Sequence, residues 1–153
     1  MISGDESVAY NKSRLRRGQA AVEWALTAPL LALLLVVSGD LMRMYYTSIE
    51  IANAAKAGAQ YGAQNAGTAA DLAGMQQAAQ NDAFDLSGMT ATASMYCQCP
   101  GSSTTFDCSD TDTCSDKRVY VQVGTAATFY TLLQYPGLPS SIQLSATAQM
   151  REQ

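Results

Sequence analysis

The feature that most constrains this chain is an uncharged apolar stretch, residues 24–39, which consists mostly of Ala, Leu and Val. Counted from Gln19, the stretch reaches the length of about 20 residues that a helix needs to cross the hydrocarbon core of a bilayer. Glu23 lies near its start, and a carboxylate at the centre of a membrane helix costs about 2.5 to 3.5 kcal/mol. The sequence therefore predicts a membrane-spanning helix over 19–39 that contains one acidic residue in need of an explanation.

Basic residues are concentrated before this stretch. Lys12, Arg14, Arg16 and Arg17 precede it, whereas the residues after Gly18 include five basic and eleven acidic ones, a net charge of −6. Because Lys and Arg are retained on the cytoplasmic side, we expect the N-terminus to stay in the cytoplasm and the rest of the chain to cross the membrane. The acidic remainder offers no basic patch for phosphates, which argues against nucleic-acid binding.

The chain after the membrane stretch is long enough for one domain. Residues 40–153 can bury a modest hydrophobic core, but they leave no room for a second large domain. We therefore divide the chain into a leader (1–18), the membrane-spanning part of an N-terminal helix (19–39) and an exported domain (40–153). The leader is polar, shows no helical periodicity and is excluded from the fold prediction.

A single long helix is predicted from Gln19 to about Ala63. Beyond the membrane, apolar and small residues recur every three or four positions, with polar residues on the opposite side. The recurring residues are Leu41, Met44, Tyr45, Ser48, Ile49, Ala52, Ala55 and Ala59. Residues 51–60 are rich in Ala and Gly, a face that can receive a neighbouring helix or the sheet of its own domain. The alternative is that the alanines simply favour helix.

The rest of the exported domain is predicted to contain a short second helix and a three-stranded antiparallel sheet. The segment from Thr68 to Asp71 resembles a capping box, which would start a helix that ends near Phe84. Alternating apolar and polar residues then predict strands. The predicted strands are 89–99, 119–129 and 142–150. Pro and Gly between Tyr130 and Ser141 exclude regular structure there. The fold class is α+β, with the helices on one face of the sheet.

Four cysteines, Cys97, Cys99, Cys108 and Cys114, fall within eighteen residues. An even, clustered set in an exported domain predicts two disulfides that staple the loop between the first two strands. A zinc site is the competing interpretation, but the spacing lacks the Cys-x2-Cys pairs that usually chelate zinc.

The disulfide pairing is predicted from the positions of the cysteines on the strand and loop. Cys97 and Cys99 lie two positions apart on one strand, so they point to the same face, and a bond between them would close a strained ring. Each is therefore expected to pair with a cysteine of the loop. Because a hairpin closes outward from its tip, we predict nested pairing, Cys99 with Cys108 and Cys97 with Cys114, over the crossed alternative.

The sequence contains no catalytic motif, so we predict that the protein is not an enzyme and needs no cofactor or metal. It has no His, no Gly-rich phosphate loop and no nucleophile placed beside a base. Four acidic residues of the loop could bind calcium, namely Asp107, Asp110, Asp112 and Asp116. Because Asp110 and Asp112 lack the Gly and the terminal Glu of an EF-hand loop, a solvated loop is favoured.

Apolar and aromatic residues gather near Pro136. Tyr130, Leu132, Leu133 and Tyr135 form either an exposed contact loop or a cover for the sheet.

A cleaved secretory signal peptide is the first alternative for the N-terminal region. Cleavage after Ser38 or Gly39 would release the domain, but Val36 at the third position back fits the small-x-small rule only loosely, and Asp40 follows closely. Glu23 is also unexpected at the start of the apolar region of a signal peptide.

Three parts of the sequence carry a resemblance to a known family. Arg17-Gly18, then Val22-Glu23-Trp24-Ala25-Leu26 and Pro29-Leu30-Leu31, resemble the processing site and N-terminal helix of type IV pilin-like proteins. The likeness is to the TadE-like pseudopilins of the tight-adherence (Flp) pilus. Residues 53–59 are similar to a small-residue stretch of that family, and residues 144–151 are similar to its closing strand.

The resemblance implies proteolytic processing and assembly. A prepilin peptidase is expected to cut on the cytoplasmic face between Gly18 and Gln19, after which the new amino terminus is methylated. Glu23 then becomes the fifth residue of the mature protein, a position at which the family has an acid that compensates the amino terminus of a neighbouring subunit. The alternative is a glutamate at headgroup depth without a partner.

The resemblance also implies a minor pseudopilin with a role in adhesion and biofilm formation. The family's major pilin is far shorter than this chain, and the larger TadG-like members carry a further domain. We expect a single-pass protein of the bacterial inner membrane, N-terminus in, with its domain in the periplasm or on an extracellular pilus. The expected partners are prepilin peptidase, other pilin or pseudopilin subunits and the pilus assembly platform. The alternative is a membrane anchor that presents an extracellular binding domain outside any pilus.

Overall fold

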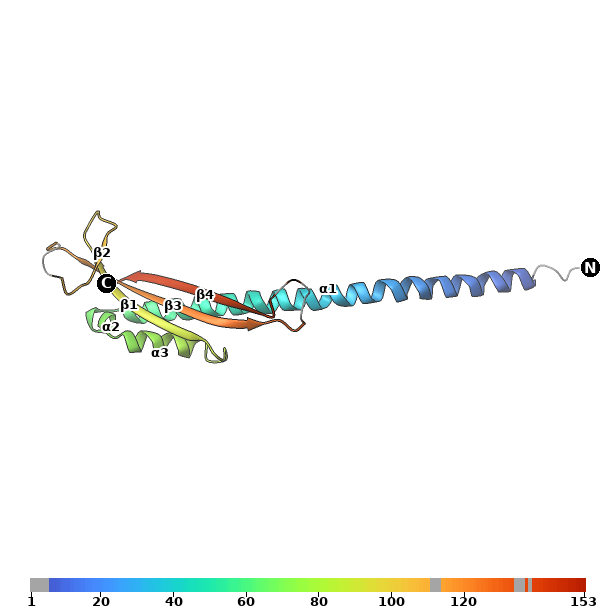
Figure 1. Cartoon of the computed structure of the whole chain (residues 1–153), viewed down its shortest axis with the longest axis horizontal. Coiled ribbons are helices and arrows are strands. Elements are labelled where there is room, and N and C mark those ends of the chain that lie inside the picture. The colour runs from blue at the N-terminus through green and yellow to red at the C-terminus, as the bar shows by residue number, and fades with distance from the viewer. Residues whose placement is uncertain (1–5, 111–113, 134–136, 138) are drawn as a thin grey trace, which may run out of the picture. The chain divides into compact units, whose positions relative to one another are not determined.

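The computed structural model describes residues 6–110, 114–133, 137 and 139–153, with side chains from Gly18 onward. It divides into two compact units, Met1–Leu41 and Met42–Gln153, which we call the N-terminal unit and the C-terminal domain. Helix α1 (Glu6–Gly62) contributes to both units (Figure 1). The prediction that the helix starts at Gln19 is wrong, because α1 already begins at Glu6. Between Glu6 and Arg17 the sequence has no Pro or Gly to end a helix.

The second predicted helix is divided into two short ones. Helix α2 (Ala66–Ala70) starts at Asn65, whose side-chain oxygen accepts hydrogen bonds from the backbone N–H groups of Gly67 and Thr68. Helix α3 (Leu72–Asp82) starts at Asp71, whose carboxylate accepts a bond from the backbone N–H of Gly74. The predicted capping box from Thr68 to Asp71 is therefore wrong. Thr68 closes the box that begins at Asn65, and Asp71 caps the next helix.

The strands form one antiparallel sheet in the order β2-β1-β3-β4 (Figure 1). The strands are β1 (Thr90–Gln98), β2 (Thr105–Phe106), β3 (Arg118–Tyr130) and β4 (Ser141–Arg151). The α+β class and the three long strands are confirmed, but the sheet has four strands and not three. In β2, Thr105 pairs with Gln98 and Phe106 pairs with Cys97. The sequence does not reveal this strand, because two residues are too few to show an alternating pattern.

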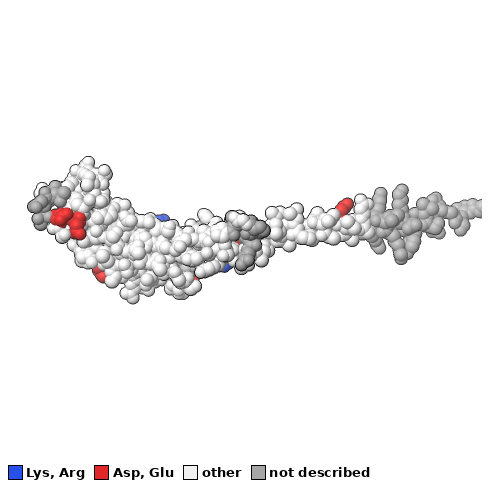
Figure 2. Space-filling model, viewed as in Figure 1, with Lys and Arg blue, Asp and Glu red and all other residues white. Residues whose placement is uncertain are grey.

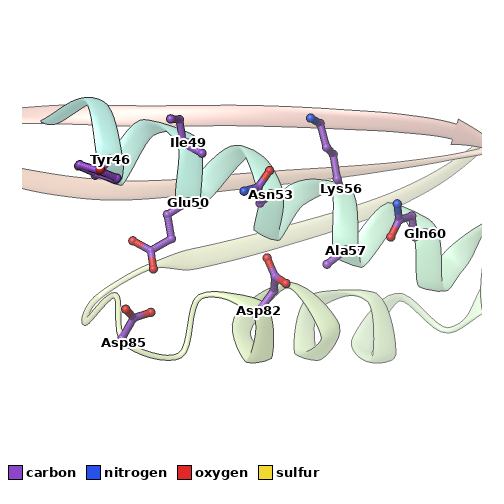
Figure 3. Close-up of a pocket in the computed structure, with 9 residues that line it drawn as sticks. All are labelled: Tyr46, Ile49, Glu50, Asn53, Lys56, Ala57, Gln60, Asp82 and Asp85. Atoms are coloured by element: carbon purple, nitrogen blue, oxygen red, sulfur yellow. The ribbon is translucent and has the colours of Figure 1, made fainter. Parts of the chain in front are cut away.

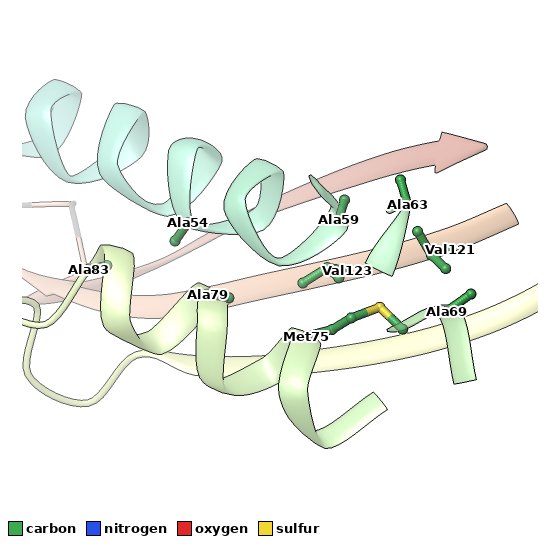
Figure 4. Close-up of a cluster of buried hydrophobic side chains, with 9 residues drawn as sticks. All are labelled: Ala54, Ala59, Ala63, Ala69, Met75, Ala79, Ala83, Val121 and Val123. Atoms are coloured by element: carbon green, nitrogen blue, oxygen red, sulfur yellow. The ribbon is translucent and has the colours of Figure 1, made fainter. Parts of the chain in front are cut away.

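The small-residue face of α1 packs against its own domain. Ala54, Ala55 and Ala59 are fully buried, and a Cβ atom added to Gly58 would lie only 2.7 Å from the backbone oxygen of Met75. Figure 4 shows the core cluster in which α1, α2, α3 and β3 meet; its members are Ala54, Ala59, Ala63, Ala69, Met75, Ala79, Ala83, Val121 and Val123. Of the two interpretations of this face, close packing is the one that the structure supports.

Hydrogen bonds and a ring contact set the register of α1 against the sheet. The buried hydroxyl of Thr125 donates to the carbonyl of Ile51 at 2.7 Å. Toward the end of β3, the guanidinium carbon of Arg43 lies 5.3 Å from the ring centroid of Phe129. At the other end of the domain, the backbone N–H of Gln153 donates to the carbonyl of Ala63. Within the C-terminal domain, α1 and β3 therefore run in opposite directions, with Arg43 beside the end of β3.

Candidate processing and assembly site

The predicted processing site lies on the surface of α1. Gly18 and Gln19 are both exposed, and a Cβ atom at Gly18 would meet nothing within 4 Å. Gly18 also lacks the positive φ that favours glycine, which only Gly88, Gly101 and Gly137 show among the described residues. The conformation of this helix therefore gives no reason for a glycine at position 18.

Glu23 lies one helical turn after Gln19 and is exposed. Residues four apart on a helix share a face, so the two side chains lie one above the other. The face of this part of α1 that Figure 2 shows is almost entirely uncharged. The two hydroxyls between Gln19 and Gly39 donate within the helix: Thr27 to the carbonyl of Glu23 at 3.0 Å, and Ser38 to that of Leu35 at 2.9 Å. In the sequence, Glu23 is the one acidic or basic residue between Gln19 and Gly39.

The apolar part of α1 exposes its large side chains. The exposed residues are Val22, Trp24, Leu26, Leu30, Leu31, Leu33, Leu34 and Leu35. Within the described residues, α1 is the one helix that is long and apolar enough to cross a membrane, and its most apolar window is not buried in the structure. Such a surface is unfavourable in water, so it must be covered by lipid or by other apolar helices. The helix continues through Pro29, as expected.

All four cysteines form disulfides, as predicted, but the nested pairing is wrong. Cys97 is bonded to Cys108 and Cys99 to Cys114, the crossed arrangement. The reason is β2, which turns back at once and pairs Phe106 with Cys97. This pairing brings Cys108, two residues further on, to a Cα–Cα distance of 5.0 Å from Cys97. Cys99, beyond the end of β1, then joins Cys114 at 6.0 Å.

The acidic residues of the disulfide loop make local contacts. The carboxylate of Asp107 accepts bonds from the backbone N–H and the hydroxyl of Ser109, and these bonds hold its pKa below its usual value. The ammonium group of Lys117 donates to the carbonyls of Cys108 and Asp110. Asp112 lies outside the described residues. In the part of the chain that the structure describes, no three His, Cys, Asp or Glu side chains are grouped so as to hold a metal ion.

A groove of about 710 Å³ lies between α1 and α3. It is lined by Tyr46, Ile49, Glu50, Asn53, Lys56, Ala57, Gln60, Asp82 and Asp85 (Figure 3). The side chain of Asp85, which can share a proton with Glu50, raises the pKa of Glu50, and partial burial and the charges of Asp85 and Asp82 add to the rise. Sequence reasoning missed this acidic group, because Glu50 lies more than thirty residues before Asp82 and Asp85 and the three follow no motif.

Comparison with known protein families concerns one segment of α1, from the predicted processing site to the small residues that pack in the C-terminal domain. Residues 18–60 match the model of the TadE-like protein family. The match confirms the resemblance predicted from the N-terminal motif, and it includes Gly18, Glu23 and the small residues that pack against α3. No curated protein and no solved structure matches the chain. We call residues 18–60 the TadE-like segment; the closing strand, whose resemblance was also predicted, lies outside it.

The disulfides should contribute strongly to the stability of the domain that follows the TadE-like segment. We expect the double substitution Cys97→Ala and Cys108→Ala to lower the free energy of unfolding by about 2 to 4 kcal/mol, because the 11-residue separation is no longer constrained in the unfolded chain. Removing the Cys99–Cys114 bond should cost a similar amount or slightly more, since it constrains the longer separation of 15 residues. Denaturant unfolding measures both. Non-reducing peptide mapping that found Cys97 linked to Cys114 would contradict the crossed pairing.

Stability should depend on pH through Glu50. Its pKa is raised above 4.5 in the folded state, so its contribution is most favourable at low pH and is lost as the pH rises from 4.5 through the folded pKa. Glu50→Gln should therefore stabilise the domain at pH 7, by about 0.5 kcal/mol or less because the site is open to solvent. The gain should vanish below pH 4.

Asp71→Asn supplies a matched control, for which we expect the opposite effect on stability at pH 7. The backbone N–H of Gly74 and the hydroxyl of Tyr61 lower the pKa of Asp71 below 3.8, so its contribution is present above that pH and lost as the pH falls through the folded pKa. This variant should be less stable than the wild type at pH 7, and the difference should shrink as the pH falls below 3.8. Thermal unfolding midpoints across pH measure both variants, and a parallel shift at all pH values would refute the assignment.

Proposed function

We propose that this protein is a TadE-like minor pseudopilin that takes part in the assembly or priming of a tight-adherence type IV pilus, and so in adhesion and biofilm formation. The observation that carries the proposal is the extent of the family match, which begins at Gly18, the predicted processing position, and includes the whole apolar stretch. The exposed apolar side chains of this stretch fit a helix that is covered by lipid before assembly and by other helices afterwards.

The proposal includes a single-pass orientation with the N-terminus inside and the domain in the periplasm or on the pilus. The basic leader supports this orientation, since Lys and Arg resist translocation. Prepilin peptidase cuts between Gly18 and Gln19. The conformation and surroundings of the helix do not require a glycine at position 18. This supports the view that the glycine is there because the peptidase recognises it.

Glu23 acts as an assembly residue in this proposal. Cleavage leaves a positive amino terminus on Gln19, and the carboxylate of Glu23 on a neighbouring subunit compensates it as the subunit docks. A charge is tolerable in an apolar environment only when a partner of opposite sign is close. The remaining partners are other pilin or pseudopilin subunits and the assembly platform of the inner membrane.

Fractionation of native cells tests the proposed role. Pili are sheared from wild-type cells and from cells that lack this protein, and both the pilus yield and the presence of the protein in pili and membranes are measured. We expect the deletion to lower pilus yield and the full-length gene to restore it. Unchanged pili, together with a protein found only in the membrane, would support instead an anchor that presents a binding domain.

A further inference from the structure

Strand β4 forms one edge of the sheet, with β3 on its inner side (Figure 1). All 11 of its residues pair with β3 in one unbroken register. Edge strands usually carry charged side chains, proline or a bulge, which prevent pairing with another chain. In β4 the only charged residue is Arg151, the last one, and there is no proline. β4 is therefore a long, regular edge that is open to a further strand.

The register shows which backbone groups of β4 point outward. The N–H of Glu152 donates to the carbonyl of Val119, and the N–H of Thr131 donates to the carbonyl of Ser140. Both bonds join residues that lie opposite each other when the β3–β4 register is continued by one residue. Because bonding residues alternate along an antiparallel strand, the even-numbered residues of β4 bond to β3. The N–H and C=O groups of the odd-numbered residues therefore point away from β3; the central ones are Gln143, Ser145, Thr147 and Gln149.

These outward groups are available for pairing. Among the described residues, none donates to or accepts from them. In the loop before β4, the side chains of Tyr130, Leu132 and Leu133 are exposed and do not cover the sheet. Tyr135, the remaining member of the predicted contact loop, lies outside the described residues. The outward row of donors and acceptors has the spacing that an added strand matches.

The side chains of β4 define what such a strand must present. The odd-numbered residues are exposed and polar, whereas the even-numbered residues are apolar and only half-buried. The half-buried ones are Ile142, Leu144, Ala146, Ala148 and Met150. Residues opposite each other in an antiparallel pair have their side chains on the same face. A strand that alternates apolar and polar residues would therefore cover the half-buried side chains with its own apolar ones.

We propose that the outer edge of β4 binds an extended segment of a different protein, which joins the sheet as a fifth strand antiparallel to β4. The segment alternates apolar residues with uncharged polar ones. Main-chain hydrogen bonds supply affinity in this mode of recognition, and alternate side chains supply specificity. The antiparallel direction is favoured because parallel pairs are slightly less stable per residue. The surface lies wholly within the C-terminal domain, so the proposal goes beyond the role in pilus assembly and does not depend on it.

The charge of the domain favours a different protein over a second copy of this chain. Residues 42–153 include five basic and nine acidic residues, a net charge of −4. Two such domains repel each other, and a net charge far from zero keeps proteins monomeric. A segment that belongs to a basic protein is attracted instead. The partner is thus an extended segment of a protein with basic surroundings.

Fluorescence anisotropy with a synthetic peptide tests the proposal on the full-length protein in detergent micelles. The probe is a labelled peptide with the sequence of residues 141–151, since β4 itself has the required alternation. Two modified probes carry backbone N-methyl groups, which block pairing along one edge of the peptide. One is methylated at the positions of Ser145 and Thr147, and the other at those of Ala146 and Ala148. When the apolar residues of probe and β4 share a face, the edge with Ser145 and Thr147 is the one that bonds to the protein.

We expect the probe methylated at positions 146 and 148 to bind like the unmodified probe. The probe methylated at positions 145 and 147 should bind at least about tenfold more weakly, the equivalent of about one lost backbone hydrogen bond. Equal binding of the two methylated probes, or no binding of the unmodified probe, would overturn the proposal.

Ser145→Pro and Ser145→Ala are matched variants of the protein. Proline removes the outward N–H of residue 145 and leaves the bonds to β3 in place, whereas alanine keeps the N–H. Ser145→Pro should bind the unmodified probe at least about tenfold more weakly, and Ser145→Ala should stay within about threefold of the wild type. Thermal unfolding checks that both variants are folded, and the methylated probes decide the matter if Ser145→Pro is not.

Sedimentation of the protein without probe tests the choice of partner. We expect one protein chain per micelle at all protein concentrations. A dimer that forms as the concentration rises, and that Ser145→Pro abolishes, would overturn the choice of a different protein and assign the edge to a second copy.

Discussion

Glu23→Ala is expected to abolish incorporation into pili while leaving cleavage at Gly18 and folding of the domain intact. In the proposed assembly, Glu23 compensates the amino terminus of a neighbouring subunit in an apolar environment. Removing one partner of a buried ion pair costs about 3 to 5 kcal/mol, because the other charge is left uncompensated. Incorporation should therefore fall by roughly two orders of magnitude or more. The amount of the protein in sheared pili, relative to the amount in membranes, measures the effect.

Conservative variants at the same position separate charge from shape. Glu23→Gln keeps nearly the same shape without the charge and should fail like Glu23→Ala, whereas Glu23→Asp should retain part of the incorporation. Cleavage between Gly18 and Gln19 should proceed in all three, which mass spectrometry of the membrane fraction can check. Normal piliation in Glu23→Gln would refute the proposed role of the carboxylate.

Gly58→Leu should strongly destabilise the C-terminal domain. A Cβ atom at this position would lie 2.7 Å from the backbone oxygen of Met75 and 3.0 Å from a methyl carbon of Val123. Backbone atoms of a packed helix cannot move aside as a flexible side chain can, so overpacking should cost about 3 kcal/mol. Domains have total stabilities of about 5 to 15 kcal/mol, so the loss should be evident in thermal unfolding of the protein in detergent micelles.

Gly39→Leu is the matched control for this prediction. It introduces the same side chain into the same helix, where a Cβ atom would meet nothing within 4 Å. Its unfolding midpoint should stay within the range of neutral surface substitutions, about 0.5 kcal/mol in free energy. Equal midpoints for the two variants would show that α1 does not pack against α3 as closely as the structure describes.

The parts of the fold that the sequence predicts are those with a local repeating signal. β4 alternates apolar and polar residues without interruption, and its predicted range agrees with the observed one to within one residue at each end. The division between α2 and α3 was missed, because Asn65 and Thr68 form a capping box without the usual Glu or Gln. β2 has two residues and no pattern, and the error in the disulfide pairing follows from its absence in the prediction.

The candidate site shows the same limit. Gly18, Gln19 and Glu23 could be selected from the sequence because they belong to one continuous motif, and the family match includes all three. The acidic group of Glu50, Asp82 and Asp85 could not, because these side chains line one groove only through the packing of α3 against α1. A surface assembled from distant segments has no sequence signature until the contacts between those segments are known.

The measurement that most directly tests the proposed function is the intact mass and N-terminal peptide of the protein isolated from its native membrane. Mass spectrometry is suitable because an N-terminal glutamine can be blocked to chemical sequencing. We predict a mature chain that begins at Gln19 and carries a methyl group on its amino terminus. A protein that retains Met1, or one that begins near Gly39 or Asp40, would contradict prepilin processing and with it the proposed role in pilus assembly.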